Sequence, residues 1–423
     1  MSELDAEICI VGGGLVGLSL AAALGSAGID TLLLDARSVE SGLQPEFDGR
    51  GSAIARGSVQ ILETLGIWQN CTRGAAPILD IRVSDGRPGE PPSPLFLHYG
   101  LEDLGKTEAP DRAAGPMGHI IENRFLRHAL VQRIAALSSV RIEAPASVAR
   151  HRVQSGHVAL TLTDGRQLRA ALAVAAEGRN SGLRAAAAIG HKTWSYRQVG
   201  VVTTLGHEED HRGTAHECFL PDGPFAVLPL TDEEGSGRHR SSLVWTAREA
   251  QCERIMALDD TAFAAACRRR FGDSLGSFEQ IGRRFAYPLR LLLADRFHAP
   301  RMAIIGETAH AIHPIAGQGL NLSLRDIAAL AELIVDARRL GQDPGNPDLL
   351  ARYTRWRRFD AVALCLVTDG LNRLFSNDIP PLRLARGLGL AAVHRAGPLK
   401  RFFMRQAMGI TGALPRLTRG EAL

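Results

Sequence analysis

An α/β fold with an inserted α+β domain and a helical C-terminal region is predicted by three features of the sequence. A strand–helix–strand unit opens the chain, alternating strand patterns fill residues 190 to about 292, and long helical patterns follow. At 423 residues the chain is too long for one compact core, so two or three domains are expected. The net charge of +4 is small for this length and indicates no nucleic-acid partner.

The cysteines and the apolar runs bear on cellular location. The six cysteines are scattered without a C-x-x-C pair, which is typical of reduced structural thiols in a cytoplasmic protein. No run reaches the ~18 consecutive apolar residues of a membrane span. The opening MSELDAEICIVGGG has acids before its apolar run and no basic region, unlike a signal peptide. These features predict a cytoplasmic protein.

The individual elements are expected from periodicity and from turn residues. Residues 79–116 are rich in Gly and Pro and predict irregular crossing loops with short strands. Helices are expected at residues 18–27, 52–65, 123–137, 259–271 and 320–340, and strands at residues 7–11, 31–34, 157–163, 167–170, 172–176, 199–205, 225–229, 241–246 and 302–305. Of these strands, residues 157–163 and 167–170 form a hairpin around Asp164-Gly165.

The turn of the opening unit reads Gly12-x-Gly14-x-x-Gly17, and Asp35 closes the second strand. The first glycine permits a tight turn, the second lets backbone approach a pyrophosphate, and the third lets helix and strand pack closely. Unpaired N–H groups and the helix dipole then favour the negative charge, and Asp35 would accept hydrogen bonds from ribose hydroxyls. A bare structural turn is the alternative. The order of the elements predicts a dinucleotide site without separating NAD from FAD.

A second candidate site lies where the strand at residues 302–305 leads through Pro314 to Gly317-Gln318-Gly319 and a long helix. The helix start offers free N–H groups and a positive dipole end. This suits an acceptor that becomes anionic, such as the N1/O2 edge of a reduced flavin, and the two glycines allow a flat ring to approach. An ordinary glycine-capped helix start is the alternative.

A third stretch, residues 175–184, combines a strand end, the turn Glu177-Gly178 and a cluster of Ser and Arg. Its alternative interpretation is a polar turn that caps a helix at Ser181.

Two E-x-x-H spacings raise the question of a metal. They are Glu307 to His310, with His313 three residues on, and Glu208 to His211. Di-iron proteins place such pairs on long helices, whereas these lie at a strand–turn and in a polar loop. We therefore predict no metal site, and we expect His310 and His313 to pack near a flavin, with contact to substrate.

Finer motifs accompany these three stretches. They are DGRGSAIA at residues 48–55, GHIIENR at 118–124, GPFAVLPL at 223–230, HPIAGQGLNL at 313–322 and TDGLNRLFSND at 368–378. Together the motifs resemble the class A flavoprotein monooxygenases of the para-hydroxybenzoate hydroxylase type, and within them the ubiquinone-biosynthesis hydroxylases. The resemblance covers nearly the whole chain.

The resemblance implies a Rossmann-like FAD-binding domain, an inserted α+β substrate domain and a helical C-terminal region. The FAD-binding domain would comprise residues 1–78, 118–189 and 295–345. Residues 79–117 would form a crossing segment on the substrate side, residues 190–294 the substrate sheet and residues 346–423 the helical region. No second Gly-x-Gly-x-x-Gly marks a separate NAD(P)H domain, as in this class.

The same resemblance implies which residues hold FAD and shape the active site. The residues expected at the cofactor are Gly12, Gly14, Val16, Gly17, Asp35, Arg50, Arg124, Glu177, Gly306, Glu307, Gly319, Leu320 and Asn321. The residues expected at the reacting ring are His313, Pro314, Gly317 and Gly319. Two positions depart from the family pattern, since Glu177 and Glu307 stand where the family usually has Asp. The longer side chain at Glu307 keeps the charge and predicts an adjusted geometry at the flavin ribityl chain.

The implied reaction is hydroxylation of a polyprenylated phenol in ubiquinone biosynthesis, through a flavin C4a-hydroperoxide. It would use FAD, O₂ and NAD(P)H or another electron donor. One alternative is a class A hydroxylase of a soluble phenolic compound. Another is an inactive flavoprotein-like scaffold of a quinone-biosynthesis complex, favoured only by the two Glu substitutions. The implied partners are a prenylated substrate and a multiprotein ubiquinone-biosynthesis complex.

The C-terminal segment suggests a further partner. Residues 381–423 are apolar and hold eight Lys or Arg and one acid, Glu421. Such a segment can lie on an anionic membrane surface, here at the inner face of the membrane. A packed helical tail with a solvated basic face is the alternative.

Overall fold

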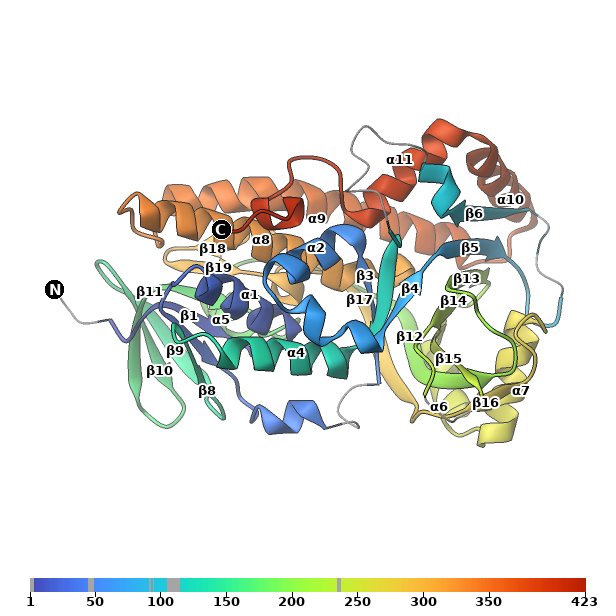
Figure 1. Cartoon of the computed structure of the whole chain (residues 1–423), viewed down its shortest axis with the longest axis horizontal. Helices are drawn as coiled ribbons and strands as arrows, with labels where there is room; N and C mark the ends of the chain where they lie inside the picture. The colour runs from blue at the N-terminus through green and yellow to red at the C-terminus, as the bar shows by residue number, and fades with distance from the viewer. Residues whose placement is uncertain (1–3, 45–48, 91–92, 94, 105–114, 234–236) are drawn as a thin grey trace.

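The computed structural model describes residues 4–44, 49–90, 93, 95–104, 115–233 and 237–423. Asp48, which opens one of the motifs above, lies outside the described residues. Figure 1 shows two sheet regions at opposite ends of the long axis, with the helices α8 (Gln318–Arg339) and α9 (Pro347–Phe375) running lengthwise along one side.

The first sheet has five parallel strands in the order β19-β11-β1-β2-β8. Their bounds are β19 Met302–Ile304, β11 Gln167–Ala175, β1 Ala6–Val11, β2 Thr31–Leu34 and β8 Val140–Glu143. Continuous apolar runs form these strands because both faces are covered, as in parallel sheets generally. Helix α1 (Leu15–Ser26) packs between α4 (Asn123–Ala135) and α8.

The edge of this sheet carries the predicted hairpin and one correction. β10 (Val158–Leu162) pairs antiparallel with the start of β11, and β9 (Val148–Val153) pairs with β10, so the hairpin is confirmed. The separate strands expected at residues 167–170 and 172–176 are one strand. Ala170 pairs with both Val158 and Ala6, so the ladder to β1 begins where the hairpin ends.

A small three-stranded sheet contains the second correction. The helix expected at residues 52–65 is a strand, β3 (Gly51–Ala55), followed by the shorter helix α2 (Arg56–Thr64). β3 pairs antiparallel with β7 (Gly118–Glu122), which also pairs with β4 (Ala75–Ile78). Pairing with a segment some 70 residues away overrides the local helical pattern.

The second sheet has nine strands, in the order β20-β17-β12-β15-β14-β13-β5-β6 with β16 beside β12. Their bounds are β20 His310–Ala311, β17 Phe285–Ala294, β12 His191–His207, β15 His239–Arg248, β14 Gly223–Pro229, β13 Thr214–Leu220, β5 Asp80–Asp85, β6 Phe96–Gly100 and β16 Phe278–Gln280. Helices α6 (Cys252–Met256) and α7 (Asp260–Phe271) cover its outer face. Its inner face packs against the small three-stranded sheet and against the C-terminal helices.

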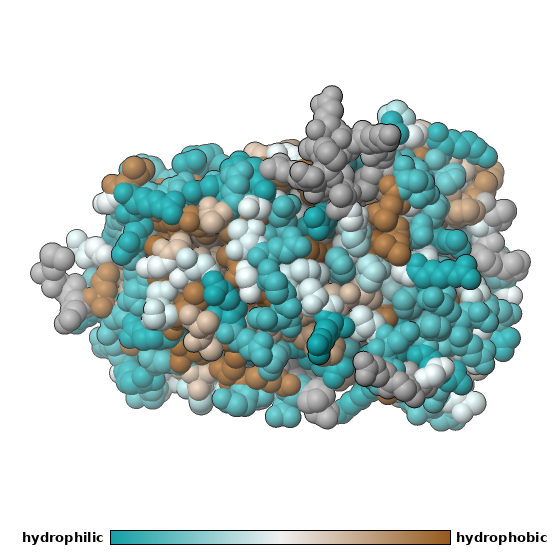
Figure 2. Space-filling view, in the orientation of Figure 1, coloured by the Kyte–Doolittle hydropathy of each residue, from teal (hydrophilic) through white to brown (hydrophobic). Residues whose placement is uncertain are grey.

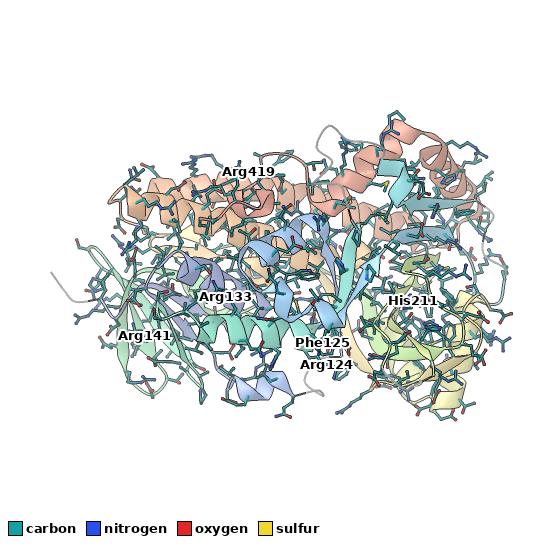
Figure 3. The ribbon with its side chains drawn as sticks, viewed as in Figure 1. Arg124, Phe125, Arg133, Arg141, His211 and Arg419 are labelled. Atoms are coloured by element: carbon teal, nitrogen blue, oxygen red, sulfur yellow. The ribbon has the colours of Figure 1, made fainter. Side chains whose placement is uncertain are left out.

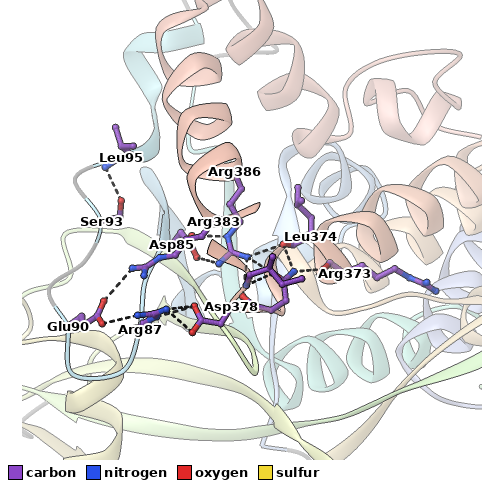
Figure 4. Close-up of polar contacts among 12 residues, drawn as sticks. Asp85, Arg87, Glu90, Ser93, Leu95, Arg373, Leu374, Asp378, Arg383 and Arg386 are labelled. Carbon is purple, nitrogen blue, oxygen red and sulfur yellow. Dashed lines mark hydrogen bonds and ion pairs between the residues drawn. The ribbon is translucent and has the colours of Figure 1, made fainter. Parts of the chain in front are cut away.

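The C-terminal helices α10 (Pro380–Arg395) and α11 (Gly397–Met408) are held on the edge of the second sheet (Figure 4). The buried guanidinium of Arg386 donates to both oxygens of buried Asp85 at 2.8 and 3.0 Å, and to the carbonyl of Leu374 at 3.0 Å. Nearby, the more exposed Arg87 forms a bidentate pair with Asp378. Within the described part of the chain, no helix is both long and apolar enough to cross a membrane.

Other short elements include β18 (His298–Ala299), α5 (Gly182–Ala186) and the 3₁₀ turns η6 (Gly306–Thr308) and η7 (Ile315–Gly317). Helix α5 follows β11 and η6 follows β19, so both lie at the carboxyl ends of the parallel strands, where α/β sheets bind their ligands.

Candidate active site

The glycine turn after β1 is shaped by close backbone contacts. Gly12 has a φ of +113°, and a Cβ atom there would lie 2.4 Å from the carbonyl oxygen of Ala176. A Cβ on Gly17 would lie 1.8 Å from the carbonyl oxygen of Gly12. A Cβ on Gly14 would meet nothing within 4 Å, so this glycine faces open space. Gly12 and Gly17 are thus required for packing, whereas Gly14 leaves room for a ligand.

That open space is a cavity of about 280 Å³. Gly14 and Leu15 line it at the start of α1, where no side chain of a described residue caps the free N–H groups. The rest of the lining is rich in cations and consists of Arg37, Gly42, Gln44, Arg50, Asn123, Arg124, Arg127 and Tyr287. A helix N-terminus facing four guanidinium groups favours a polyanion such as a pyrophosphate.

The two predicted arginines reach this cavity from separate segments. The guanidinium of Arg50 lies 5.0 Å from the ring centroid of Tyr287. Arg124 lies at the start of α4, 4.6 Å over the ring of Phe125, and pairs with Glu122 at 3.1 Å (Figure 3). The structure therefore brings Gly14, Arg50 and Arg124 together.

Asp35, at the end of β2, holds the glycine turn. Its Oδ2 accepts a hydrogen bond from the Gly13 N–H at 2.5 Å, and its Oδ1 accepts one from the Arg37 N–H at 2.8 Å. Each carboxylate oxygen retains a second acceptor position. Asp35 can therefore order the turn and still accept a ribose hydroxyl.

The central and late motifs meet at the carboxyl ends of β11 and β19. The Gly178 N–H donates to the Thr308 Oγ1 at 3.0 Å, and buried Arg184 donates to the Thr308 carbonyl at 3.0 Å. Gly306 adopts a φ of +59°, and a Cβ there would lie 3.0 Å from Val16. The expected residues Val16 and Gly306 are thus in contact.

The two unusual glutamates have different partners. Ser181 caps the short helix α5, as the alternative interpretation expected, by accepting from the Arg184 N–H at 3.0 Å. Glu177 supports this cap by accepting hydrogen bonds from the Ser181 hydroxyl and, at 3.1 Å, from the Leu183 N–H. Glu307 pairs with Arg179 at 3.1 and 2.9 Å, and both side chains are partly exposed. The carboxylate of Glu307 is therefore already paired with a cation.

The loop before α8 is anchored on β3. Gly317 has a φ of +60°, and its added Cβ would lie 2.7 Å from the Cβ of Ala53. The Asn321 amide donates to the Ala53 carbonyl at 2.8 Å and accepts from the Ala55 N–H at 2.9 Å. A Cβ on Gly319 would meet nothing within 4 Å. Asn321 thus fixes the loop, Gly319 borders open space, and Leu320 packs partly buried against the main core.

His313 is fully buried and precedes Pro314, the N-cap residue of the η7 turn. Its ring lies edge-on to Tyr196 with centroids 5.0 Å apart. Neither ring nitrogen has a hydrogen-bond partner among the described residues. Burial lowers the pKa of His313 to about 3, so the ring is neutral at physiological pH and is not poised for proton transfer.

Sequence reasoning missed a buried polar network below the late motif. His310 Nε2 lies 2.5 Å from the Asp326 carboxylate, which also accepts from Arg357 at 2.9 Å and from the Gly306 N–H at 3.3 Å. Burial alone would raise the pKa of Asp326, but His310 and Arg357 lower it overall. The signal in the sequence was an acid, Asp326, placed directly before the apolar run IAALA of α8.

The two E-x-x-H spacings do not bring their side chains to one point. Glu307 pairs with Arg179 and His310 with Asp326, while Glu208 accepts from the Ser277 N–H and His211 lies 3.0 Å from the Leu230 carbonyl. Among the described residues, three candidate ligands come together at His98, Glu102 and Asp103, where Asp103 already pairs with Lys400.

Comparison with known proteins identifies the class. Residues 5–365 match the family described as FAD binding domain. The chain belongs to this family, and its class is the FAD-dependent aromatic monooxygenases. The arginine-lined cavity beside Gly14 fits the diphosphate of the dinucleotide that the family binds.

Individual relatives show which group within this class the chain belongs to. Ubiquinone hydroxylase UbiL of Rhodospirillum rubrum is 47% identical over 421 residues, covering 99% of this chain and 94% of the relative. The 3-demethoxyubiquinol 3-hydroxylase of Escherichia coli is 33% identical over 412 residues, covering 97% of this chain and 100% of the relative. Within the class, the chain belongs to the ubiquinone-biosynthesis hydroxylases.

A solved structure confirms the predicted fold. The p-nitrophenol 4-monooxygenase PnpA from Pseudomonas putida has a TM-score of 0.79 at 18% identity, covering 98% of this chain and 100% of that chain. An FAD-binding α/β domain with an inserted α+β domain is thus the architecture of this protein.

Proposed function

We propose that the protein hydroxylates the ring of a polyprenylated phenol in ubiquinone biosynthesis, using FAD, O₂ and NAD(P)H or another electron donor. The observation that carries this proposal is 47% identity to a ubiquinone hydroxylase over 99% of the chain. Bound FAD would supply oxygen activation and transfer. The protein would supply orientation, a dry site and fixed charge.

We assign the cofactor roles from the cavity. The diphosphate of FAD would lie against the N–H groups at the start of α1, beside Gly14, with Arg50 and Arg124 as cations. Asp35 would accept the ribose hydroxyls while it holds the glycine turn. Glu307 would accept a hydroxyl of the ribityl chain while Arg179 keeps its charge balanced.

The flavin ring would lie at the start of α8. Gly319 leaves open space there, and Gly317 lets the loop approach β3. Free N–H groups at the helix start stabilise negative charge on the ring edge. His313 and Pro314 would form one wall of the flavin site. The pKa of His313 is too low for proton exchange near pH 7, so its neutral ring would contribute packing contacts only.

The inner face of the second sheet suits a long apolar substrate. Two apolar clusters lie on it, one joining Ala215 to Met404 and Met408 of α11, the other joining Phe219 to Ile315 of η7. These packed clusters extend from the predicted flavin loop to the C-terminal helices. A prenyl chain would lie along them, which favours a prenylated phenol over a soluble phenolic compound.

The domain division follows the sheets. The segments assigned to the FAD-binding domain supply the parallel strands and α8, and residues 190–294 supply most of the second sheet. Residues 79–117 add β5 and β6 to that sheet. We place the boundaries at the residues expected from the sequence.

We also propose that α10 and α11 contact an anionic membrane at its inner, cytoplasmic face, where a ubiquinone-biosynthesis complex would assemble. Leu399, Phe402 and Phe403 are exposed at helical spacing on α11, and exposed arginines flank them. Figure 2 shows apolar surface near this end of the molecule, right of centre towards the top. Apolar side chains among cations are typical of helices that lie in a membrane interface.

Vesicle binding tests this contact. The variant F402S/F403S should lose most co-sedimentation with anionic vesicles, whereas L340S, which removes a still more exposed leucine at the C-cap of α8, should retain it. Equal binding by both variants would contradict the contact.

The absorption spectrum tests the proposed function. Purified protein should carry, or take up, about one FAD per chain and should then hydroxylate a short-chain prenylphenol. A colourless protein that cannot be loaded with FAD would favour the scaffold alternative instead.

A further inference from the structure

The cofactor-binding roles proposed above do not involve the carboxyl group of Glu217. It lies at the middle of β13, between β14 and β5, with Ala226 and Val83 as its cross-strand neighbours. Alternation along the strand sets its direction. Cys218 and Leu220 belong to the cluster under α6 and α7 on the outer face, so Glu217 points to the inner face with Ala215 and Phe219.

The position of Glu217 on that face relates it to the proposed flavin loop. Phe219, one strand step of about 7 Å away, packs with Ile315 of η7 and stacks on Phe375 at 4.2 Å. In the other direction, Ala215 belongs to the cluster that contains Met404 and includes Ala53, the residue that faces Gly317. Glu217 therefore lies between the two apolar clusters that line the proposed substrate path.

The carboxyl of Glu217 has no hydrogen bond or ion pair within the described residues, although it retains some accessible surface. Ala215, Phe219 and Ala226 around it are buried. Asp85, the acid beside Phe219 on the same face, is by contrast fully paired with Arg386. Burial raises the pKa of Glu217 to about 8. A partly buried carboxyl without a protein partner loses part of its hydration, so a ligand that provides a partner is favoured.

We propose that Glu217 is the polar anchor of the substrate ring, forming a hydrogen bond with the phenolic hydroxyl. This inference rests on the proposed function and adds the residue that recognises the phenol. A carboxyl on an otherwise apolar wall fixes which ring edge faces the flavin loop. It discriminates strongly against an analogue without the hydroxyl, because that analogue leaves the carboxyl unpaired.

Paired ligands test the anchor. Binding of a short-chain prenylphenol and of the matching prenylbenzene, which lacks the hydroxyl, is measured on FAD-loaded protein by calorimetry and by flavin fluorescence. We expect the wild type to prefer the phenol by about tenfold or more. E217L should reduce this preference to about twofold with prenylbenzene binding retained, and E217Q, which still forms hydrogen bonds, should keep most of it.

Two controls separate the anchor from a structural role. E279L removes an exposed glutamate of β16 in the same sheet and should keep the wild-type preference. The melting temperature of E217L should equal or exceed that of the wild type, because an unpaired buried carboxyl is replaced by an apolar group.

Each outcome has a distinct meaning. If E217L loses the preference for the phenol while E217Q and E279L keep it, Glu217 is supported as the anchor. A wild-type preference retained in E217L overturns the anchor and leaves the proposed function standing. A wild type that does not prefer the phenol overturns the proposed substrate class and the anchor with it.

Discussion

Arg179 and Glu307 form a bidentate ion pair that joins the central and late motifs across 128 positions of the chain. The pair explains how the longer glutamate is accommodated, since its carboxylate meets the guanidinium of Arg179 at 3.1 and 2.9 Å. The same carboxylate lies beside Gly306, where the parallel strands end, and is proposed to accept the ribityl chain.

E307A should weaken FAD binding by about tenfold to a hundredfold, because a charge-assisted hydrogen bond contributes roughly 1.5–3 kcal/mol. The stability of the apoprotein should change by less than about 1 kcal/mol, since the ion pair is partly exposed. FAD titration and thermal unfolding measure the two effects. The matched variant R179A breaks the same pair but keeps the carboxylate, and FAD affinity within about threefold of wild type is expected. Equal losses in both variants would assign the binding to the pair rather than to Glu307.

Two substitutions in the glycine turn should distinguish an effect on cofactor binding from an effect on folding. G14A should fold with a normal melting temperature, because Gly14 has an ordinary φ of −73° and an added Cβ meets no protein atom. It should nevertheless lose FAD affinity by about a hundredfold, because the methyl group projects into the proposed diphosphate site. G17A places its Cβ 1.8 Å from the Gly12 carbonyl and should be severely destabilised. Tight FAD binding by G14A would place the diphosphate elsewhere.

The buried pair Arg386–Asp85 should be the strongest polar anchor of the C-terminal helices. R386A leaves a buried carboxylate without its partner and should cost about 3–5 kcal/mol in the free energy of unfolding. R87A breaks the neighbouring pair with Asp378, which is partly exposed, and should cost much less than R386A. Denaturant titration of both variants provides the comparison. Similar losses would mean that burial does not distinguish the two pairs.

The raised pKa of Glu217 predicts how the free energy of unfolding depends on pH. Its pKa is about 8 in the folded protein against an ordinary value of 4.5, so between these values the folded state binds more protons than the unfolded state. Its contribution to stability is therefore greatest below about pH 4.5 and is lost as the pH rises towards 8, by up to about 1.4 kcal/mol per pH unit. E217Q should flatten this decline in denaturant titrations between pH 5 and 8. An identical decline in both proteins would show that Glu217 is not the titrating group.

Local features of the sequence were sufficient for the cofactor fingerprint. Gly12, Gly14, Gly17 and Asp35 lie within one βαβ unit, where strand, turn and helix follow directly from neighbouring residues. The strand β3 could not be predicted in this way, because its pairing with β7 depends on residues some 70 positions away. The helical pattern of residues 52–65 was therefore misleading.

The polar partners of the site also depend on distant contacts. Nothing in the local sequence marks Arg179 as the partner of Glu307, or Asp326 as the partner of His310, because each pair forms only when the chain folds. Glu217 could not be recognised because the sequence does not say which face of β13 points inward. Neighbouring strands and the covering helices decide that direction.

The central claim is that this chain, loaded with FAD, hydroxylates the ring of a prenylated phenol. The most direct measurement is the mass of the product formed from a short-chain prenylphenol under ¹⁸O₂ when the bound FAD is reduced. We predict incorporation of one labelled oxygen atom into the ring, at a level that falls with FAD loading in G14A. A fully FAD-loaded protein that returns unlabelled, unmodified phenol would contradict the account.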